Sequence, residues 1–165
     1  MALAAGCGST VSGSPATTTR NLDDIQVWNP CTQLGDGVLL STGVDPATKS
    51  VTTDPPQGPA AWRICGWYPP GRAYKMTVYS SSHTVAESKA NEKNTGFRDV
   101  TIGPRSGMTY QDKSDAQGDR CYASFPAEQG MFEVSASWTG TGARTLDMCE
   151  TAVKHAKDLE PHLPK

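Results

Sequence analysis

Cysteine is the residue type with the most specific chemistry in this sequence of 165 residues. The five cysteines are Cys7, Cys31, Cys65, Cys121 and Cys149. No two of them have the close C-x-x-C spacing that is typical of zinc sites and dithiol redox centres. Four are dispersed through the chain, which favours two disulfides in an oxidising compartment. The fifth, Cys7, lies far from the others and needs a separate explanation.

Cys7 has the sequence context of a bacterial lipobox. It follows the run Leu3-Ala4-Ala5-Gly6, and in a lipobox small residues precede a cysteine that is alkylated with diacylglycerol after the signal peptide is cut. One position departs from the pattern, because Ala4 stands where a branched aliphatic residue is usual. We therefore predict that acyl groups such as palmitate on Cys7 attach the exported protein to the outer face of the cytoplasmic membrane.

The segments around Cys7 divide the chain into three parts. Only six residues precede it, fewer than the apolar stretch of about 7–15 residues in a signal peptide. We therefore expect residues 1–7 to be the remnant of a longer signal peptide. Residues 8–21 are mostly Gly, Ser, Thr and Ala, and they cannot bury enough apolar surface to fold, so they predict a flexible tether. Residues 22–165 then form a single domain.

Charge and hydropathy exclude two classes of protein. The formal net charge is -2 and the charged fraction is 19%, without the excess of Lys and Arg that a nucleic-acid surface requires. No run approaches the roughly 18 apolar residues of a membrane-spanning helix. We expect membrane attachment through Cys7 alone and no nucleic-acid partner.

Capping residues predict two short helices early in the domain. Asn29 and Pro30 fit the cap and first turn of one helix. Asp36 is the candidate cap of a second, which Gly43 ends. The Thr-, Asp- and Pro-rich stretch that follows predicts a loop with an edge strand at residues 50–53.

Alternation of apolar and polar residues predicts the strands of a sheet. The expected strands cover residues 61–68, 73–80, 96–102, 108–112, 120–125 and 131–138, with a short helical segment within 85–94. The last helix begins at Asp147, with Glu150 three residues later as in a capping box, and ends at Pro161. The pattern predicts an α+β fold in which an antiparallel sheet of hairpins carries N- and C-terminal helices packed on it.

The cysteines and their neighbours also carry a family resemblance. The resembling features are Asn29-Pro30-Cys31, Cys65-Gly66-Trp67, Cys121 at the start of a late hairpin, Cys149-Glu150-Thr151-Ala152 and a Leu163-Pro164 close. In this order the chain resembles the DUF3558 family of actinobacterial lipoproteins. Where that family usually has a Gly-Arg pair, this sequence has Gly103-Pro104-Arg105. The resemblance implies export and lipid anchoring, and it implies no known reaction.

Four cysteines allow three disulfide pairings. We favour Cys31–Cys65 and Cys121–Cys149. Cys121 begins one arm of a hairpin whose other arm ends at residue 138, so a short loop brings Cys149 beside it, within the roughly 7 Å that a disulfide needs between Cα atoms. The alternative, in which Cys31 pairs with Cys149 and Cys65 with Cys121, stays open for helices that lie side by side.

Motifs for catalysis are weak. His83 follows Ser80-Ser81-Ser82, but neighbouring strand residues point to opposite faces and no Gly-x-Ser-x-Gly turn is present. His155 and His162 belong to the last helix and its end, where we expect solvated positions. The acidic run from Asp112 to Asp119 lacks the spacing of a calcium-binding loop. We expect no catalytic residues, no metal and no cofactor.

Aromatic residues concentrate in the hairpin from Trp62 to Tyr79. If the strand alternates, Trp62 and Tyr68 face opposite to Trp67, so one face belongs to the core. The other face is either covered by helix and loops or open to a sugar, a lipid or a partner. We expect non-enzymatic binding of a partner protein or an envelope glycolipid. An envelope hydrolase with a site invisible to motifs and a structural spacer stay as alternatives, and the ligand-binding residues are unknown at this level.

Overall fold

The computed structural model describes residues 20–56 and 58–165. The predicted lipobox, its acylated Cys7 and residues 8–19 of the predicted tether lie outside the described residues. Among the described residues, no helix combines the length and the apolar character needed to cross a bilayer.

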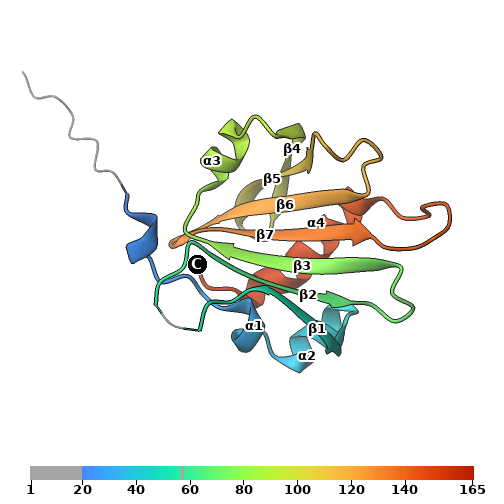
Figure 1. Ribbon diagram of the computed structural model, residues 1–165, viewed down its shortest axis with the longest axis horizontal. Coiled ribbons are helices and arrows are strands. Elements are labelled where there is room, and N and C mark those ends of the chain that lie inside the picture. Colours follow the sequence, from blue (N-terminus) through green and yellow to red (C-terminus); the bar gives the residue numbers. More distant parts are fainter. Residues whose placement is uncertain (1–19, 57) are drawn as a thin grey trace, which may run out of the picture.

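The domain is organised around one antiparallel sheet (Figure 1). Its strands are β1 (Asp45–Thr53), β2 (Trp62–Tyr68), β3 (Tyr74–Ser81), β4 (Asn94–Ile102), β5 (Arg105–Asp112), β6 (Arg120–Ala127) and β7 (Gly130–Trp138). They lie in the order β1-β2-β3-β7-β6-β5-β4, and every neighbouring pair is antiparallel. The α+β class with an antiparallel sheet is confirmed.

The strand order consists of two meanders. Strands β1 to β3 form one and strands β4 to β7 form the other, and β3 joins them by pairing with β7. At this junction Val78 lies opposite Val134. The first meander was predicted too short, because β1 covers residues 45–53 and not only 50–53. Its polar, largely exposed residues belong to an edge strand, where burial imposes little alternation.

In the described part of the chain, four α-helices and two 3-10 turns accompany the sheet. They are η1 (Leu22–Asp24), α1 (Pro30–Gln33), α2 (Asp36–Thr42), α3 (Val85–Ala90), α4 (Met148–Leu159) and η2 (Glu160–His162). The α-helices are labelled in Figure 1. Helix α4 packs on β6 and β7, α1 contacts β2, and α2 contacts α4. Helix α3 contacts β4 and β6.

Three of the helix caps that the sequence predicted are present, at Asn29, Gly43 and Asp147. Asn29 accepts a hydrogen bond from the backbone of Cys31 at the start of α1, and Asp147 accepts two at the start of α4. Gly43 ends α2 with a φ of 94°, a conformation that only glycine adopts without strain. Asp36 is not the cap of α2. Gly35 occupies that position, and the Asp36 carboxylate lies in the first turn, where it interacts favourably with the helix dipole.

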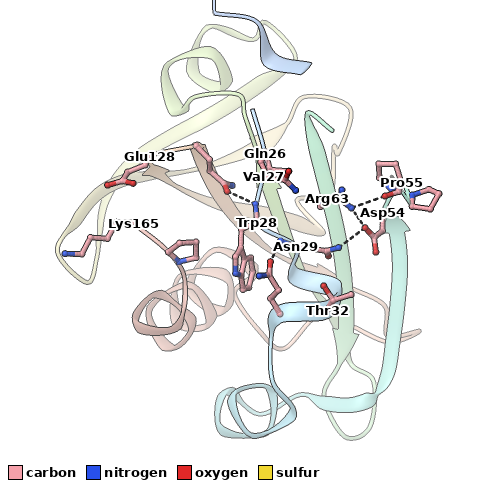
Figure 2. Close-up of a pocket in the computed structure, with 14 residues that line it drawn as sticks. Gln26, Val27, Trp28, Asn29, Thr32, Asp54, Pro55, Arg63, Glu128 and Lys165 are labelled. Atoms are coloured by element: carbon pink, nitrogen blue, oxygen red, sulfur yellow. Dashed lines mark hydrogen bonds and ion pairs between the residues drawn. The ribbon is translucent and has the colours of Figure 1, made fainter. Parts of the chain in front are cut away.

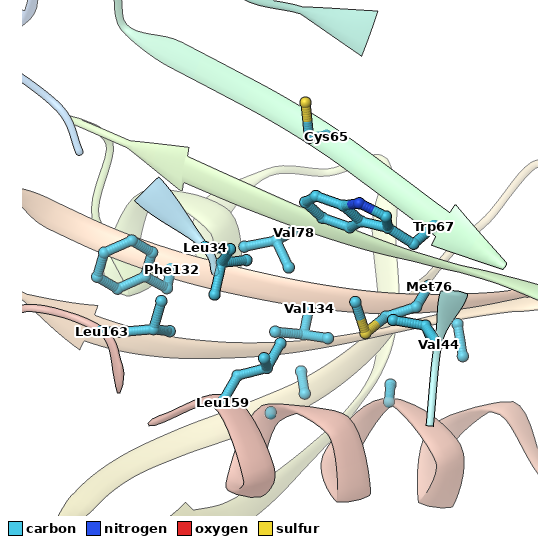
Figure 3. Close-up of a cluster of buried hydrophobic side chains, with 14 of the residues drawn as sticks. Leu34, Val44, Cys65, Trp67, Met76, Val78, Phe132, Val134, Leu159 and Leu163 are labelled. Atoms are coloured by element: carbon cyan, nitrogen blue, oxygen red, sulfur yellow. The ribbon is translucent and has the colours of Figure 1, made fainter. Parts of the chain in front are cut away.

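The hydrophobic core lies between α4 and one face of the sheet (Figure 3). On β7, the alternate residues Phe132, Val134 and Ala136 are fully buried there, as the alternation predicted. Leu159 of α4 packs against this face, and the indole of Trp67 lies in the same cluster from β2. We call this the inner face and the opposite one the outer face.

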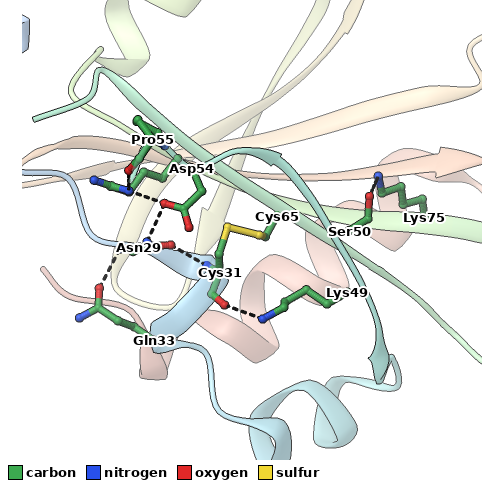
Figure 4. The surroundings of a disulfide bond; sticks show 10 residues. Asn29, Cys31, Gln33, Lys49, Ser50, Asp54, Pro55, Cys65 and Lys75 are labelled. Carbon is green, nitrogen blue, oxygen red and sulfur yellow. Dashed lines mark hydrogen bonds and ion pairs between the residues drawn. A yellow bond between two sulfur atoms is a disulfide. The ribbon is translucent and has the colours of Figure 1, made fainter. Parts of the chain in front are cut away.

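Two disulfides fasten helices to the sheet. Cys31 of α1 is bonded to Cys65 of β2, with 5.3 Å between their Cα atoms (Figure 4). Cys121 of β6 is bonded to Cys149 of α4, with a Cα separation of 4.9 Å. These are the pairs that the sequence favoured. The first disulfide joins α1 to a strand of the first meander, and the second joins α4 to a strand of the second meander.

Arg105 holds the C-terminal end of the chain. Its Nε donates a 2.9 Å hydrogen bond to Glu160, and its guanidinium also donates to the carbonyl oxygens of Pro126 and Pro164. The turn before Arg105 requires glycine at position 103 for two reasons. The φ of Gly103 is 56°, and a Cβ at this position would collide with the Glu160 carboxylate. The Gly-Pro-Arg sequence thus has a structural role.

Candidate functional site

Among the cavities that the described residues form, two are candidates for the functional site. The larger, about 650 Å³, lies at one end of the sheet, where the segment before α1 meets the C-terminal residues (Figure 2). The smaller, about 400 Å³, lies on the outer face of the sheet. The partners of their polar side chains distinguish them.

Polar side chains of the larger cavity are engaged with one another (Figure 2). Arg63 is 7% exposed, forms an ion pair with Asp54 and donates to the carbonyl of Pro55. The side-chain amide of Asn29 also donates to Asp54, at 2.9 Å. These contacts tie α1 and the segment after β1 to β2.

Gln129 makes a similar connection in the same cavity. Its Oε1 accepts a 2.7 Å hydrogen bond from the backbone N–H of Trp28, and its Nε2 donates to Ser80, also at 2.7 Å. The chain before α1 is therefore fixed to the β6–β7 turn and to β3. The polar groups of this cavity hold the fold together, which explains their presence without a ligand.

The smaller cavity, which we call the aromatic pocket, has a different composition. Its lining residues come from all seven strands, from α3 and from the residue after α3. They are Thr53, Trp62, Ile64, Tyr79, Ser88, Asn91, Asn94, Tyr110, Asp112, Tyr122 and Glu133. Most of this surface is apolar, with a few polar groups, as is usual for small-molecule sites.

Strand register brings the aromatic rings together. Tyr110 of β5 is paired with Tyr122 of β6, and their rings stack with centroids 4.9 Å apart and an interplanar angle of 8°. Tyr79 of β3 follows, 5.8 Å from Tyr122, and Trp62 of β2 lies edge-on to Tyr79 at 6.4 Å. The rings form a continuous aromatic surface from β5 to β2. Alternation places all four on the outer face.

Glu133 is the unusual residue of this surface. It occupies the outer face of the central strand β7, yet its side chain is buried, with 2% exposure. Oε1 accepts hydrogen bonds from the Tyr110 hydroxyl at 2.6 Å and from the Ser88 hydroxyl of α3 at 3.1 Å. None of the ion pairs in the described part of the chain includes Glu133. The carboxyl group therefore has hydroxyl partners and no cation.

Burial determines the acid–base properties of the pocket. Loss of hydration raises the pKa of Glu133 above its ordinary value, and the hydroxyl donors around it only partly oppose this effect. Burial, with the nearby Tyr122, raises the pKa of Tyr79 to about 12, and burial together with Glu133 raises the pKa of Tyr110. The tyrosines are thus neutral hydrogen-bonding groups at neutral pH.

The predicted alternation in the aromatic hairpin agrees with these positions. Trp67 lies in the core with 1% exposure, whereas Trp62 and Tyr79 line the aromatic pocket on the opposite face. Tyr68 lies away from the pocket, with the Arg72 guanidinium 4.3 Å from its ring centre. Tyr74 faces the helix layer, where its hydroxyl lies 2.8 Å from Nε2 of His155.

The serines before His83 do not converge on it. Ser80 accepts from Gln129, and Ser81 donates to the carbonyl of Ala61. The Ser82 hydroxyl is buried without a hydrogen-bond partner among the described residues. The His83 ring stacks on Trp62 at 5.4 Å. No serine–histidine pair suitable for nucleophilic catalysis is formed by these four residues.

His155 departs from its expected solvated position, because α4 turns it inward with 1% exposure. The Thr42 hydroxyl donates to Asp158 at 2.9 Å, so His155 Nδ1–H donates to Thr42 and Nε2 accepts from Tyr74. Burial lowers the pKa of His155 to about 4, and the neutral ring is fully hydrogen-bonded. Helical periodicity predicts which residues lie on the same face of α4. It does not predict that hydrogen-bonding partners from other elements will bury His155 on that helix.

Glu133 is the pocket residue that the sequence analysis missed. It is the one charged residue in the strand from Gly130 to Trp138. An acidic residue in a predicted strand indicates either a solvent-exposed position or a functional site. Among the described residues, which include the stretch from Asp112 to Asp119, no group of three or more potential metal ligands occurs.

Comparisons with known proteins give a family and no activity. Searches of curated proteins and of solved structures found no match. The family model described as "Protein of unknown function (DUF3558)" matches residues 2–162, so the chain belongs to the DUF3558 family.

Proposed function

We propose that this protein is an exported, lipid-anchored envelope protein that binds the headgroup of an envelope glycolipid and catalyses no reaction. The observation that carries the proposal is the aromatic pocket, a cavity of about 400 Å³ with four aromatic side chains and the buried carboxyl of Glu133. A cavity of this size accommodates a small headgroup, whereas a partner protein usually covers a flatter and much larger surface.

The chemistry of the pocket suits a sugar headgroup. Ring faces of Trp62, Tyr79 and Tyr122 offer apolar surface to the C–H groups of a sugar ring. The side-chain amides of Asn91 and Asn94 offer donors and acceptors for its hydroxyl groups. Both disulfides support the export half of the proposal, since such bonds persist in oxidising compartments.

Lipid analysis of the purified protein tests the binding proposal. The exported protein should be purified from membranes, and its bound lipids identified by mass spectrometry. Trp62→Ala and Tyr122→Ala should reduce the bound glycolipid at least tenfold. Leu40→Ala, a change at a 63% exposed position of α2, should not. Equal glycolipid content in all four proteins would contradict the proposal.

Phase partitioning tests the anchor separately. Two or three acyl chains bind a membrane firmly, whereas a protein without them has only weak contacts. The protein should therefore partition into detergent and carry acyl mass on Cys7, while Cys7→Ser should remain in the aqueous phase. A Cys7→Ser protein that stays in the membrane fraction would exclude acylation of this residue as the anchor.

A further inference from the structure

We propose that the headgroup carries an ammonium group, as an amino sugar does, and that Glu133 is its counter-ion in the aromatic pocket. This inference rests on the proposed binding of a glycolipid headgroup and specifies which headgroup chemistry the pocket selects.

Charge complementarity is the first argument. The residues that line the aromatic pocket include two carboxylic acids, Asp112 and Glu133, and no Lys, Arg or His. The larger cavity, in contrast, has Arg63 and Lys165 beside its acids. A surface with only acidic charges repels anionic headgroups and favours cations.

The position of Glu133 is the second argument. A buried carboxyl group is normally paired with a cation or a metal, because its charged form loses hydration. Glu133 has only hydroxyl partners, and both Tyr110 and Ser88 donate to the same oxygen, Oε1. The rings of Trp62, Tyr79 and Tyr122 line the same pocket, and the faces of aromatic rings attract organic cations. An ammonium group would meet both kinds of partner at once.

The elements around Glu133 supply no competing cation. Strands β3, β5 and β6 contribute the phenol side chains of Tyr79, Tyr110 and Tyr122. Arg120 of β6 donates to the Tyr122 hydroxyl at 3.3 Å, but it is held by Ser137 and does not line the pocket.

Helix α3 likewise directs its charges elsewhere. Its Glu87 closes the capping box with Thr84, and Lys89 lines a separate cavity together with Asp99. Ser88 is the one residue of α3 that lines the aromatic pocket.

Binding of an ammonium group has a defined proton balance. Where Glu133 is protonated, the carboxyl proton leaves to solvent as the ammonium ion pairs with the carboxylate, and one proton is released for each ligand bound. The affinity for an amine should therefore rise with pH until Glu133 is ionised, as long as the amine stays charged. The affinity for a neutral sugar has no such dependence on Glu133.

Three octyl glycosides that differ at one position test the inference. They are octyl glucoside, octyl 2-amino-2-deoxyglucoside and its N-acetyl derivative, which lacks the charge. In calorimetric titrations below their micelle concentrations, the amine should bind at least tenfold more tightly than the other two. At a pH where Glu133 of the free protein is protonated, binding of the amine should also release a proton, measured as a heat that changes with the ionisation enthalpy of the buffer.

Glu133→Gln and the exposed control Glu92→Gln separate charge from shape. Glu133→Gln should lose the preference for the amine over octyl glucoside, whereas Glu92→Gln should keep this preference. Equal binding of all three glycosides by the wild type would overturn the ammonium proposal while leaving the sugar pocket intact. Absence of binding of all three would overturn the proposed function as well.

Discussion

The hydroxyl of Tyr110 donates a 2.6 Å hydrogen bond to Oε1 of Glu133, so a side chain of β5 contacts one of β7 across the intervening β6. This contact lies on the face of the sheet opposite to α4. Most of the testable consequences of the structure concern this carboxyl group and the other buried polar groups.

Replacement of Glu133 should change how stability depends on pH. Because the pKa of Glu133 is raised in the fold, the folded protein holds its proton where the unfolded chain has lost it. Its contribution to stability is therefore present below about pH 4.5 and is lost as the pH rises through the folded pKa. Relative to the wild type, Glu133→Gln should gain stability as the pH rises. Urea unfolding from pH 4 to 8 measures this, and parallel curves for the two proteins would contradict it.

His155 should give the opposite dependence. Its pKa falls from 6.5 to about 4 on folding, so its contribution to stability is complete above pH 6.5 and decreases as the pH falls toward 4. This decrease in the pKa corresponds to a loss of about 3 kcal/mol in the free energy of unfolding. His155→Gln should remove most of this acid sensitivity, although it costs stability at neutral pH. The exposed His162→Gln should unfold with the wild-type pH profile, and the same profile in His155→Gln would refute the assignment.

The two disulfides should contribute similarly to stability. They close loops with sequence separations of 34 and 28 residues, and each is worth about 3–4 kcal/mol in the chain-entropy description. Paired alanine substitutions of Cys31 with Cys65, and of Cys121 with Cys149, should lower the free energy of unfolding by comparable amounts. Non-reducing peptide mapping of the wild type checks the pairing itself, and a peptide that joins Cys31 to Cys149 would disprove it.

Arg105 should be far more important than a surface arginine. Its pair with Glu160 is nearly enclosed, with both side chains 10% exposed, so Arg105→Gln leaves a buried carboxylate without a cation. The free energy of unfolding should fall by about 3–5 kcal/mol, and the double variant Arg105→Gln, Glu160→Gln should recover part of this stability. The exposed pair of Arg144 with Asp119 is the matched control, and Arg144→Gln should cost at most about 1 kcal/mol. If Arg105→Gln and Arg144→Gln lowered the free energy of unfolding equally, burial of the Arg105–Glu160 pair would not be what makes it important for stability.

Much of the fold was predictable because one face of the sheet is tightly packed. Phe132, Val134 and Ala136 alternate along β7 because each faces the core, and the same constraint identifies the β2–β3 hairpin. Helix caps such as Asp147 were predictable because their hydrogen bonds are local. The edge strand β1 was underestimated, since no such burial acts on most of its residues.

The aromatic pocket was only half predictable. Alternation placed Trp62 and Tyr79 on the face opposite to Trp67, but it could not show what else lies there. Glu133 is enclosed by Ser88, which is 45 residues away in the sequence, and by Tyr110, which belongs to a non-adjacent strand. His155 was missed for the same reason, because Thr42 and Tyr74 reach it from distant elements. Buried polar networks depend on tertiary contacts that a single sequence does not encode locally.

The junction between β3 and β7 has a consequence for how the molecule can be divided. Cys31–Cys65 lies before α3 and Cys121–Cys149 lies after it, so neither disulfide connects the two meanders. Among the described residues, the segment that carries α3 is the only covalent connection between the two meanders. A chain cut there would give two fragments, each with its own intact cross-link, held together by one strand pairing and by contacts such as those of α2 with α4. We therefore expect fragment complementation, in which the two meanders are expressed as separate polypeptides and reassemble through the pairing of β3 with β7.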